Sequence, residues 1–439
     1  MKHAGRTATI PALLLIAWAC GGGETSDGGP AAPTTGLNSP DRTLALDMSP
    51  VYQIGGFEAE DWAVFGRVSG LRFDAQGNLY VLDGQARQIT VISPDGTFQR
   101  TVGKPGEGPG ELSNPFGFDV TPDGTVAVLD LGHRGFVLFD AQGQNAGSIP
   151  VDIQALGFPT EFSHHPSGAI VGPIRGQMRI RGGGTPDQGP PTRPVAYFPM
   201  DESQGEGRIF YNAWNLPAVE DDENQTLAVG GGSVSIRMPV ERAFEPGLFA
   251  AVLPDGRIAV VDSVGYRVKL VSVEGEVLGK LERPVPPTPV TDAIRIQEKE
   301  RRLAALQEGD GPTMVVQLRS DGPGGGGGQV NQDAVRRMFE QRLEGMVFAE
   351  QIPVIEAMAV DWDGRIWLQR SSGVPGEDGP TDVITADESY LGTIPADGLR
   401  TPRAFGPGGL IARIERDEFD VETIVVERLP RSLSGTDDM

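Results

Sequence analysis

Side chains suited to acid–base or covalent chemistry near neutral pH are few in this chain. It has one cysteine, and only three of its four histidines, His133, His164 and His165, lie beyond the first twenty residues. A zinc site made of histidines would have to recruit all three, yet they occupy different places in the strand pattern described below. The G-x-S-x-G sequence that presents a nucleophilic serine in many hydrolases is missing. We therefore predict no catalytic residues and no metal site.

Charged residues that precede glycine turns are the candidates for contacts to a ligand. Each lies five to eight residues before such a turn, near the expected start of an innermost strand. These candidates are Arg72, Asp119, Glu161, Glu356 and Arg403. We expect that replacing them together weakens ligand binding without unfolding the chain.

A strand–turn–strand unit that recurs six times would position these residues. Its clearest copy is GFDVTPDGTVAVLD at 117–130, in which two alternating apolar runs flank a Pro-Asp-Gly turn. The turn glycines of the six copies are Gly77, Gly124, Gly168, Gly256, Gly364 and Gly409. His164 stands four residues before its turn, where other copies have Phe73 and Val120. We therefore interpret His164 as a packed core histidine rather than a ligand.

Several copies continue into a third and a fourth strand, at 81–103, 128–150 and 260–282. Four strands in each of six units predict an all-β fold, a six-bladed β-propeller. The stretch 103–144 resembles an NHL repeat, with a glycine-rich lead-in, an NPxG step, a DG turn and a V-x-D strand end. Its first glycines lead into a strand rather than a helix, so we interpret them as a connection between blades and not as a phosphate loop. The overall plan is similar to the six-bladed propeller lipoproteins of bacterial envelopes.

This resemblance also raises calcium as an alternative cofactor. Gluconolactonase-like and strictosidine-synthase-like propellers hold a calcium ion at the axis with oxygen ligands from several inner strands, and such a cage needs six or more oxygens. Only Asp119 and Glu161 supply carboxylates in the corresponding columns here, and Arg72 would repel a cation. The sequence therefore favours a protein without a cofactor.

The ends of the propeller are expected to meet. Residues 410–430 read as two strands of the sixth blade, which lacks an outer strand. We predict that 43–56 supplies this strand and closes the ring beside 423–429, because an open propeller would leave sheet edges exposed.

Two insertions interrupt the repeats, at about 177–246 and 284–350. The segments at either end of the first insertion are expected to complete the third blade, and residues 229–240 predict a further strand. The second is helical by composition at 290–307 and 331–348. We expect this helical excursion between blades four and five to lie across one end of the propeller, either as a packing decoration or as a lid.

The N-terminus resembles a bacterial lipoprotein signal peptide. Residues 1–20 combine positive charges, an apolar core too short to span a bilayer and small residues before Cys20, the expected site of lipidation. Residues 21–42 are rich in Gly, Pro, Ser and Thr and predict a flexible tether. The propeller is expected over 43–430, followed by a disordered tail at 431–439.

The net charge of −23 disfavours nucleic acid and anionic lipid as partners. We expect an exported monomer in the cell envelope that meets the membrane only through its lipid anchor. The favoured function is a non-enzymatic binding module that recognises an envelope protein or polymer at one propeller face. The alternative is a metal-dependent hydrolase or lyase of gluconolactonase-like type.

Overall fold

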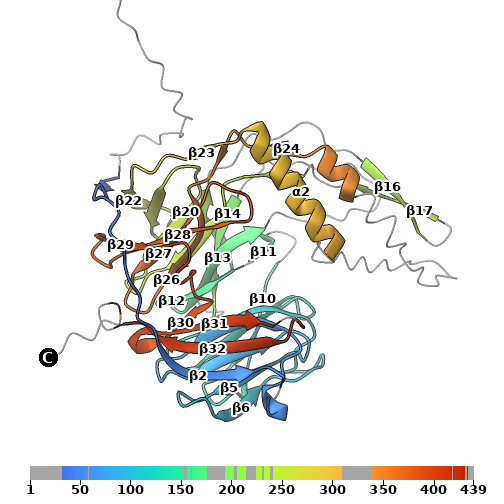
Figure 1. The fold of residues 1–439 in the computed structure, drawn as a ribbon. Helices are drawn as coiled ribbons and strands as arrows, with labels where there is room; N and C mark the ends of the chain where they lie inside the picture. The colour runs from blue at the N-terminus through green and yellow to red at the C-terminus, as the bar shows by residue number, and fades with distance from the viewer. Residues whose placement is uncertain are drawn as a thin grey trace, which may run out of the picture. The chain divides into compact units, whose positions relative to one another are not determined.

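Six antiparallel sheets follow one another along the chain (Figure 1). Blade one contains β3 Val68–Phe73, β4 Leu79–Asp83, β5 Gln88–Ile92 and β6 Phe98–Val102. Blade two contains β7 Pro115–Val120, β8 Val126–Asp130, β9 Gly135–Phe139 and β10 Asn145–Pro150. Blade three contains β12 Ser163–His165, β13 Ala169–Arg175, β14 Arg193–Pro199 and β15 Arg208–Ala213, with β11 Phe158–Pro159 beside β13.

The remaining three blades repeat this plan. Blade four contains β19 Phe249–Val252, β20 Ile258–Val261, β21 Arg267–Val271 and β22 Val277–Glu282. Blade five contains β26 Ile355–Val360, β27 Ile366–Ser371, β28 Asp378–Ile384 and β29 Tyr390–Ile394. Blade six contains β30 Ala404–Phe405, β31 Leu410–Arg416 and β32 Glu422–Arg428, completed by β2 Ser49–Gly55.

The computed structural model describes residues 32–57, 59–152, 156–159, 161–175, 193–201, 205–213, 224–229, 232–237, 241–308, 339–417, 419–430 and 433. One compact unit begins at Pro33 and contains all six blades. The expected signal peptide, Cys20 and most of the expected tether and tail lie outside the described residues. None of the helices in the described ranges is long and apolar enough to cross a membrane.

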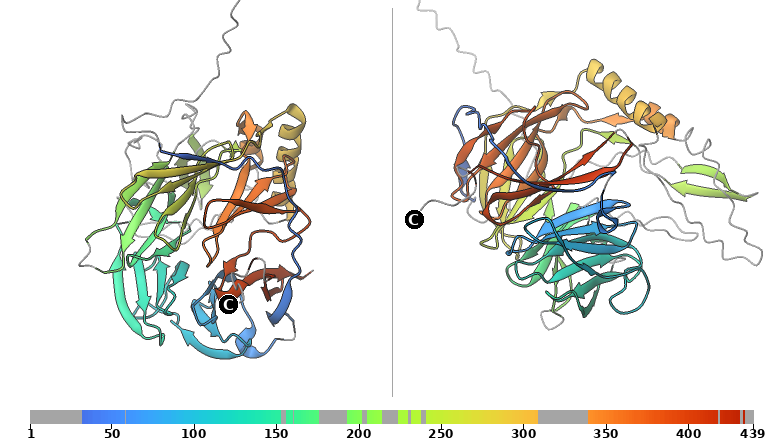
Figure 2. Two further views of the ribbon diagram at one scale, coloured as in Figure 1. Left: turned by 90° about the vertical axis from the view of Figure 1, so that its left-hand side faces the viewer. Right: turned by 60° about the horizontal axis from the view of Figure 1, so that its bottom comes forward.

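Contacts between innermost strands hold the blades in a ring. β3 touches β7 and β30, while β12 touches β7 and β19, and β19 touches β26. Blades five and six are joined where the Trp362 indole donates a hydrogen bond to the Phe405 carbonyl at 2.7 Å. The left view of Figure 2 shows the sheets arranged around a common centre in chain order. The structure therefore confirms the predicted six-bladed β-propeller.

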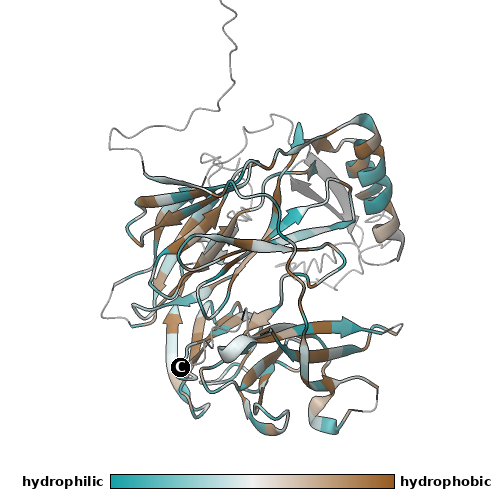
Figure 3. Cartoon of the chain, turned by 60° about the vertical axis from the view of Figure 1, so that its left-hand side comes forward, coloured by the Kyte–Doolittle hydropathy of each residue, from teal (hydrophilic) through white to brown (hydrophobic). Residues whose placement is uncertain are grey.

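The core lies between neighbouring blades rather than inside any one sheet. Every residue of β4, β8 and β20 is buried, because a neighbouring blade covers each face of these second strands. In Figure 3 hydrophobic segments lie along the strands. All six predicted turn glycines have φ between 75° and 91°, a region that residues with a Cβ rarely adopt. The repeat is therefore built on these turns, as the sequence predicted.

The ring closes as predicted. Strand β2 pairs antiparallel with β32, with Ile54 opposite Ile424, so it supplies the missing outer strand of blade six. Figure 1 shows β2, near the N-terminus, beside β32, near the C-terminus. This closure satisfies the backbone groups of an edge that would otherwise be free to pair with another chain.

The predicted tether boundary at residue 42 is wrong, because the chain joins the propeller earlier. Strand β1 Thr34–Gly36 pairs in parallel with β22 of blade four, and Thr43 bridges to Thr393 of blade five. Between them Asp41 contacts Arg283 at 2.8 Å and Arg370 at 2.9 Å. Asp382 contacts the same two arginines, at 2.6 Å and 3.5 Å. We call Asp41, Arg283, Arg370 and Asp382 the buried arginine cluster.

The secondary structure of the two insertions agrees in part with the elements predicted from the sequence. The flanks of the first complete blade three with β14 and β15, while β16 Asn224–Val229 and β17 Gly232–Arg237 form a separate hairpin. The second contains helix α2 Asp292–Glu308 and a helical turn at 339–344. The helix expected to run to 348 ends sooner, because β24 Val347–Phe348 pairs with β18 Arg242–Ala243. Its expected start, 331–338, lies outside the described residues.

Short strands and 3-10 turns link the larger elements. Strand β23 Thr288–Pro289 pairs with β25 Gln351–Ile352, which brings together the two ends of the second insertion. The described residues include the 3-10 turns η1 Asp61–Ala63 and η3 Pro407–Gly409.

Candidate functional site

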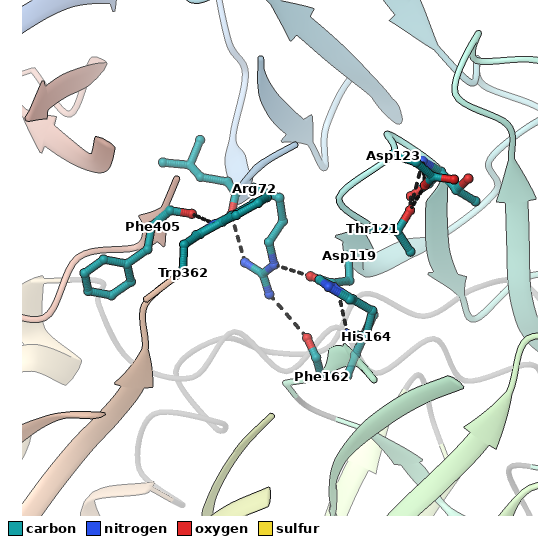
Figure 4. A network of polar contacts seen from close by, with 10 residues as sticks. Arg72, Asp119, Thr121, Asp123, Phe162, His164, Trp362 and Phe405 are labelled. Carbon is teal, nitrogen blue, oxygen red and sulfur yellow. Dashed lines mark hydrogen bonds and ion pairs between the residues drawn. The ribbon is translucent and has the colours of Figure 1, made fainter. Parts of the chain in front are cut away.

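Three inner strands bring a cluster of ionisable side chains together. Arg72 on β3 contacts Asp119 on β7, with 2.7 Å between Nε and Oδ1. His164 on β12 contacts the other oxygen of the same carboxylate, with 2.8 Å between Nδ1 and Oδ2. The backbone N–H of His164 also donates to Oδ2 at 2.6 Å. Figure 4 shows the three side chains converging from three blades, and we call them the inner-strand cluster.

The repeat explains why these residues meet. Arg72 and Asp119 each stand five residues before a turn glycine, so they occupy equivalent places on adjacent inner strands. The sequence predicted both residues near the starts of their strands. In the structure both lie near the ends. Arg72 reaches further, because its Nη1 donates to the Leu71 carbonyl at 2.8 Å and its Nη2 to the Phe162 carbonyl at 3.4 Å. The guanidinium thus spans from blade one to blade three.

Exposure differs sharply within the cluster. The Asp119 side chain is 4% exposed, whereas those of Arg72 and His164 are each 32% exposed. A buried carboxylate is tolerated when it is ion-paired and hydrogen-bonded, and Asp119 receives both kinds of contact on its two oxygens. The two cationic partners therefore keep part of their surface open to solvent or to a ligand.

The electrostatics favour the charged forms of both ionisable partners. Burial disfavours the carboxylate of Asp119, but the His164 hydrogen bond and the Arg72 charge outweigh it and lower its pKa. Burial also disfavours the imidazolium of His164, yet the hydrogen bond and charge of Asp119 outweigh burial and the repulsion from Arg72, so its pKa is raised. Asp123, in the following turn, adds a smaller attraction (Figure 4). When His164 is protonated, two cations share the single carboxylate of Asp119.

The ring of His164 is also oriented for proton transfer. Its Nδ1 is held by Asp119, and among the described residues no protein atom hydrogen-bonds its Nε2. A carboxylate that fixes one ring nitrogen and leaves the other open is the arrangement of a general acid or base. The cluster can therefore bind an anion, or move a proton at Nε2.

Of the five predicted ligand contacts, only Arg72 and Asp119 are brought together. Glu161 and Arg403 are exposed and lie just before β12 and β30. Glu356 lies on β26 and lines a different cavity, beside α2. In the part of the chain that the structure describes, no ion pair links these three to the other candidates.

The interpretation of His164 as a packed histidine is wrong, since its side chain is one-third exposed and ion-paired. The equivalent Phe73 and Val120 are buried as expected. The packed histidine is its neighbour His165, whose Nε2 lies 2.8 Å from the Gly256 carbonyl of blade four. An alignment of the six repeats could have found His164. Asp119 stands five residues before the turn glycine of its blade and His164 four residues before that of the next blade, so the two positions are neighbours in the alignment.

The remaining histidine does not join the cluster. His133 Nδ1 lies 3.2 Å from Asp130, and its Nε2 lies 3.3 Å from the Glu107 carbonyl. Within the described ranges, no group of three or more His, Cys, Asp or Glu side chains is placed to hold a metal ion.

One family model agrees with the architecture. The pattern of a family described as a 6-bladed beta-propeller matches residues 57–165. No curated protein matches the sequence. Among solved structures, the chain is similar to a protein of Bacteroides fragilis described as exported, at 10% identity over 91% of this chain and 100% of that one, with a TM-score of 0.46.

Two enzymes are also similar to the chain. One is virginiamycin B lyase from Staphylococcus aureus, at 11% identity over 88% of this chain and 100% of that one, with a TM-score of 0.39. The other is a gluconolactonase from Xanthomonas campestris, at 13% identity over 92% and 99%, with a TM-score of 0.36. The function therefore has to be argued from the residues of this chain.

Proposed function

We propose that this protein is an exported β-propeller, tethered to the cell envelope by its N-terminus, that binds a ligand through an anionic group at the inner-strand cluster. The observation that carries this proposal is the sharing of one buried carboxylate by two partly exposed cationic groups, Arg72 and His164. A carboxylate or phosphate of a ligand would complete the pairing that Asp119 leaves unfinished.

Non-enzymatic binding remains the favoured role. The carboxylate of Asp119 is committed to its two partners, and the only thiol of the chain is Cys20, in the segment that resembles a signal peptide. The ligand class we propose is an envelope protein or polymer that carries carboxylate or phosphate groups. Anchoring by a lipid on Cys20 is part of the same proposal and rests on the sequence of residues 1–20 alone.

Retention of envelope components tests this function. The full-length protein and the double variant R72Q/H164Q would be immobilised, exposed to solubilised cell envelope and eluted with increasing salt. We expect the wild type to retain one component that the variant loses, and R403Q, which removes an exposed arginine outside the cluster, to behave as wild type. Equal retention by the wild type and the double variant would refute the assignment.

The anchor has a separate test. Cys20→Ser removes the only thiol to which a lipid could be attached. We expect this variant to leave the membrane fraction without losing its ligand. If the variant stayed in the membrane fraction as the wild type does, the lipidation proposal would be wrong.

One observation favours a second candidate, an enzyme of hydrolase or lyase type. The open Nε2 of His164, oriented by Asp119, is suited to take or give a proton. A screen of lactone, ester and lyase substrates would then find turnover that H164Q abolishes. Activity that a chelator removes but H164Q leaves intact would instead point to the metal-dependent chemistry expected of the gluconolactonase-like alternative.

A further inference from the structure

A cavity lies between helix α2 and blade five. Its volume is about 200 Å³, and none of its lining residues belongs to the inner-strand cluster. Apolar groups from Phe244, Ile352, Val374 and Pro375 form part of its wall. Pockets for drug-sized ligands run from about 300 to 1,000 Å³, so this cavity suits a ligand no larger than a single amino-acid residue.

Arg301 brings a guanidinium group to this cavity that keeps one nitrogen open. Its Nε and Nη2 contact the carboxylate of Glu298 at 2.7 Å and 2.9 Å. The same carboxylate also holds Arg302 at 2.6 Å, and Arg302 has a second acidic partner in Glu241. Arg301 is 47% exposed, and its Nη1 has no hydrogen-bond partner among the described residues. Its stem lies against Gly376, where an added Cβ would come within 2.9 Å of the Arg301 Cδ.

Glu356 gives the same cavity a negative charge. It is partly exposed, stands second in the inner strand β26, and forms no ion pair with any cation in the described ranges. Partial burial, followed by the nearby carboxylate of Asp378, raises its pKa, while the Ser371 hydroxyl acts in the opposite direction. Arg301 and Glu356 therefore line one small cavity without forming a salt bridge with each other.

We propose that this cavity binds an α-amino acid with a small apolar side chain, its ammonium group on Glu356 and its carboxylate on Arg301. Two opposite charges that face one cavity and do not neutralise each other are matched by a small zwitterion, which brings both counter-charges at once. The apolar wall formed by Phe244, Ile352 and Val374 receives the side chain. This site is independent of the function proposed for the inner-strand cluster.

Isothermal titration calorimetry of the full chain tests the proposal with L-valine and two derivatives. N-acetyl-L-valine lacks the ammonium group, and L-valinamide lacks the carboxylate. We expect L-valine to bind with a dissociation constant below about 1 mM, a free energy near −4 kcal/mol, and each derivative to bind at least tenfold more weakly. E356Q and R301Q should each weaken L-valine binding at least tenfold.

Two matched variants complete the design. R295Q changes an arginine of the same helix that is 46% exposed and does not line the cavity, so it should bind L-valine as the wild type does. R72Q should also bind normally, which separates this site from the inner-strand cluster. The proposal is overturned if L-valine does not bind the wild type, if both derivatives bind as tightly as L-valine, or if E356Q and R301Q leave the affinity unchanged.

Discussion

The inner-strand cluster and the buried arginine cluster use the same kinds of side chain in opposite surroundings. In the buried arginine cluster, Arg283 is 3% exposed and two carboxylates, Asp382 and Asp41, serve two arginines. In the inner-strand cluster, one buried carboxylate serves two cationic groups that are each one-third exposed. Charges that are mostly buried and balanced in number hold blades together, whereas cationic groups that are partly exposed and outnumber their carboxylate can accept a ligand.

The buried arginine cluster has a further role in the ring. Asp41 belongs to the N-terminal segment, Arg283 follows blade four, and Arg370 and Asp382 belong to blade five. The Arg283 guanidinium also lies 3.9 Å from the centre of the Tyr390 ring. The segment that precedes the closing strand β2 is thus fixed to two blades before it reaches the sixth. We infer that this cluster stabilises closure of the ring.

The largest expected effect is from Asp382→Asn. The buried Arg283 would keep only the half-exposed Asp41 as a charged partner, and removing one partner of a buried pair costs about 3–5 kcal/mol. Urea unfolding followed by tryptophan fluorescence would measure this loss in the free energy of unfolding. A loss below about 1 kcal/mol would show that the cluster is not a structural element, and the comparison would fail.

The same change in the inner-strand cluster, Asp119→Asn, should cost less. Arg72 and His164 are partly exposed and can take up water when the carboxylate charge is removed. We expect a loss of about 1–2 kcal/mol in the free energy of unfolding, measured in the same way. A larger loss than that of Asp382→Asn would reverse the roles assigned to the two clusters.

A change of pH is expected to have a smaller effect on stability and on anion affinity than either substitution. The pKa of His164 is raised in the folded protein, so its contribution to stability is complete below its unfolded pKa of about 6.5 and is lost as pH rises through the folded value. Anion binding should weaken over the same rise in pH, because the imidazolium loses its charge. Affinity for the retained envelope component, measured from pH 6 to pH 9, should fall in the wild type. A flat profile would remove His164 from the binding site.

The fold could be predicted because its signals are local. Gly77, Gly124 and the other turn glycines mark each blade through their own backbone conformation, and the missing outer strand of blade six left one candidate, β2. The tether boundary at residue 42 could not be found in this way. Thr34–Gly36 is a short, Thr- and Gly-rich strand whose partner, β22, is more than 240 residues away.

The candidate site was only partly accessible from the sequence. The repeat pattern indicates Arg72 and Asp119 as candidates but not as a pair. Their contact with each other and with His164 depends on how three blades pack, which the pattern within one strand does not encode. The repeat pattern also indicates Glu356, which lies on the inner strand β26. It cannot indicate Arg301, because this residue lies on a helix inserted into the repeat. The position of that helix follows from tertiary contacts and not from the period of the blades.

Nuclear magnetic resonance of the histidine rings tests the central claim most directly. The chain has four histidines, so ¹⁵N-labelled rings can be assigned in the full-length protein with single His→Gln variants. Titration with acetate, and separately with inorganic phosphate, near pH 6 should shift the Nε2 signal of His164 and leave that of His165 unchanged. In R72Q the shift should be weakened at least tenfold in apparent affinity. If His164 does not respond to either anion, or responds equally in R72Q, the inner-strand cluster is not an anion-binding site.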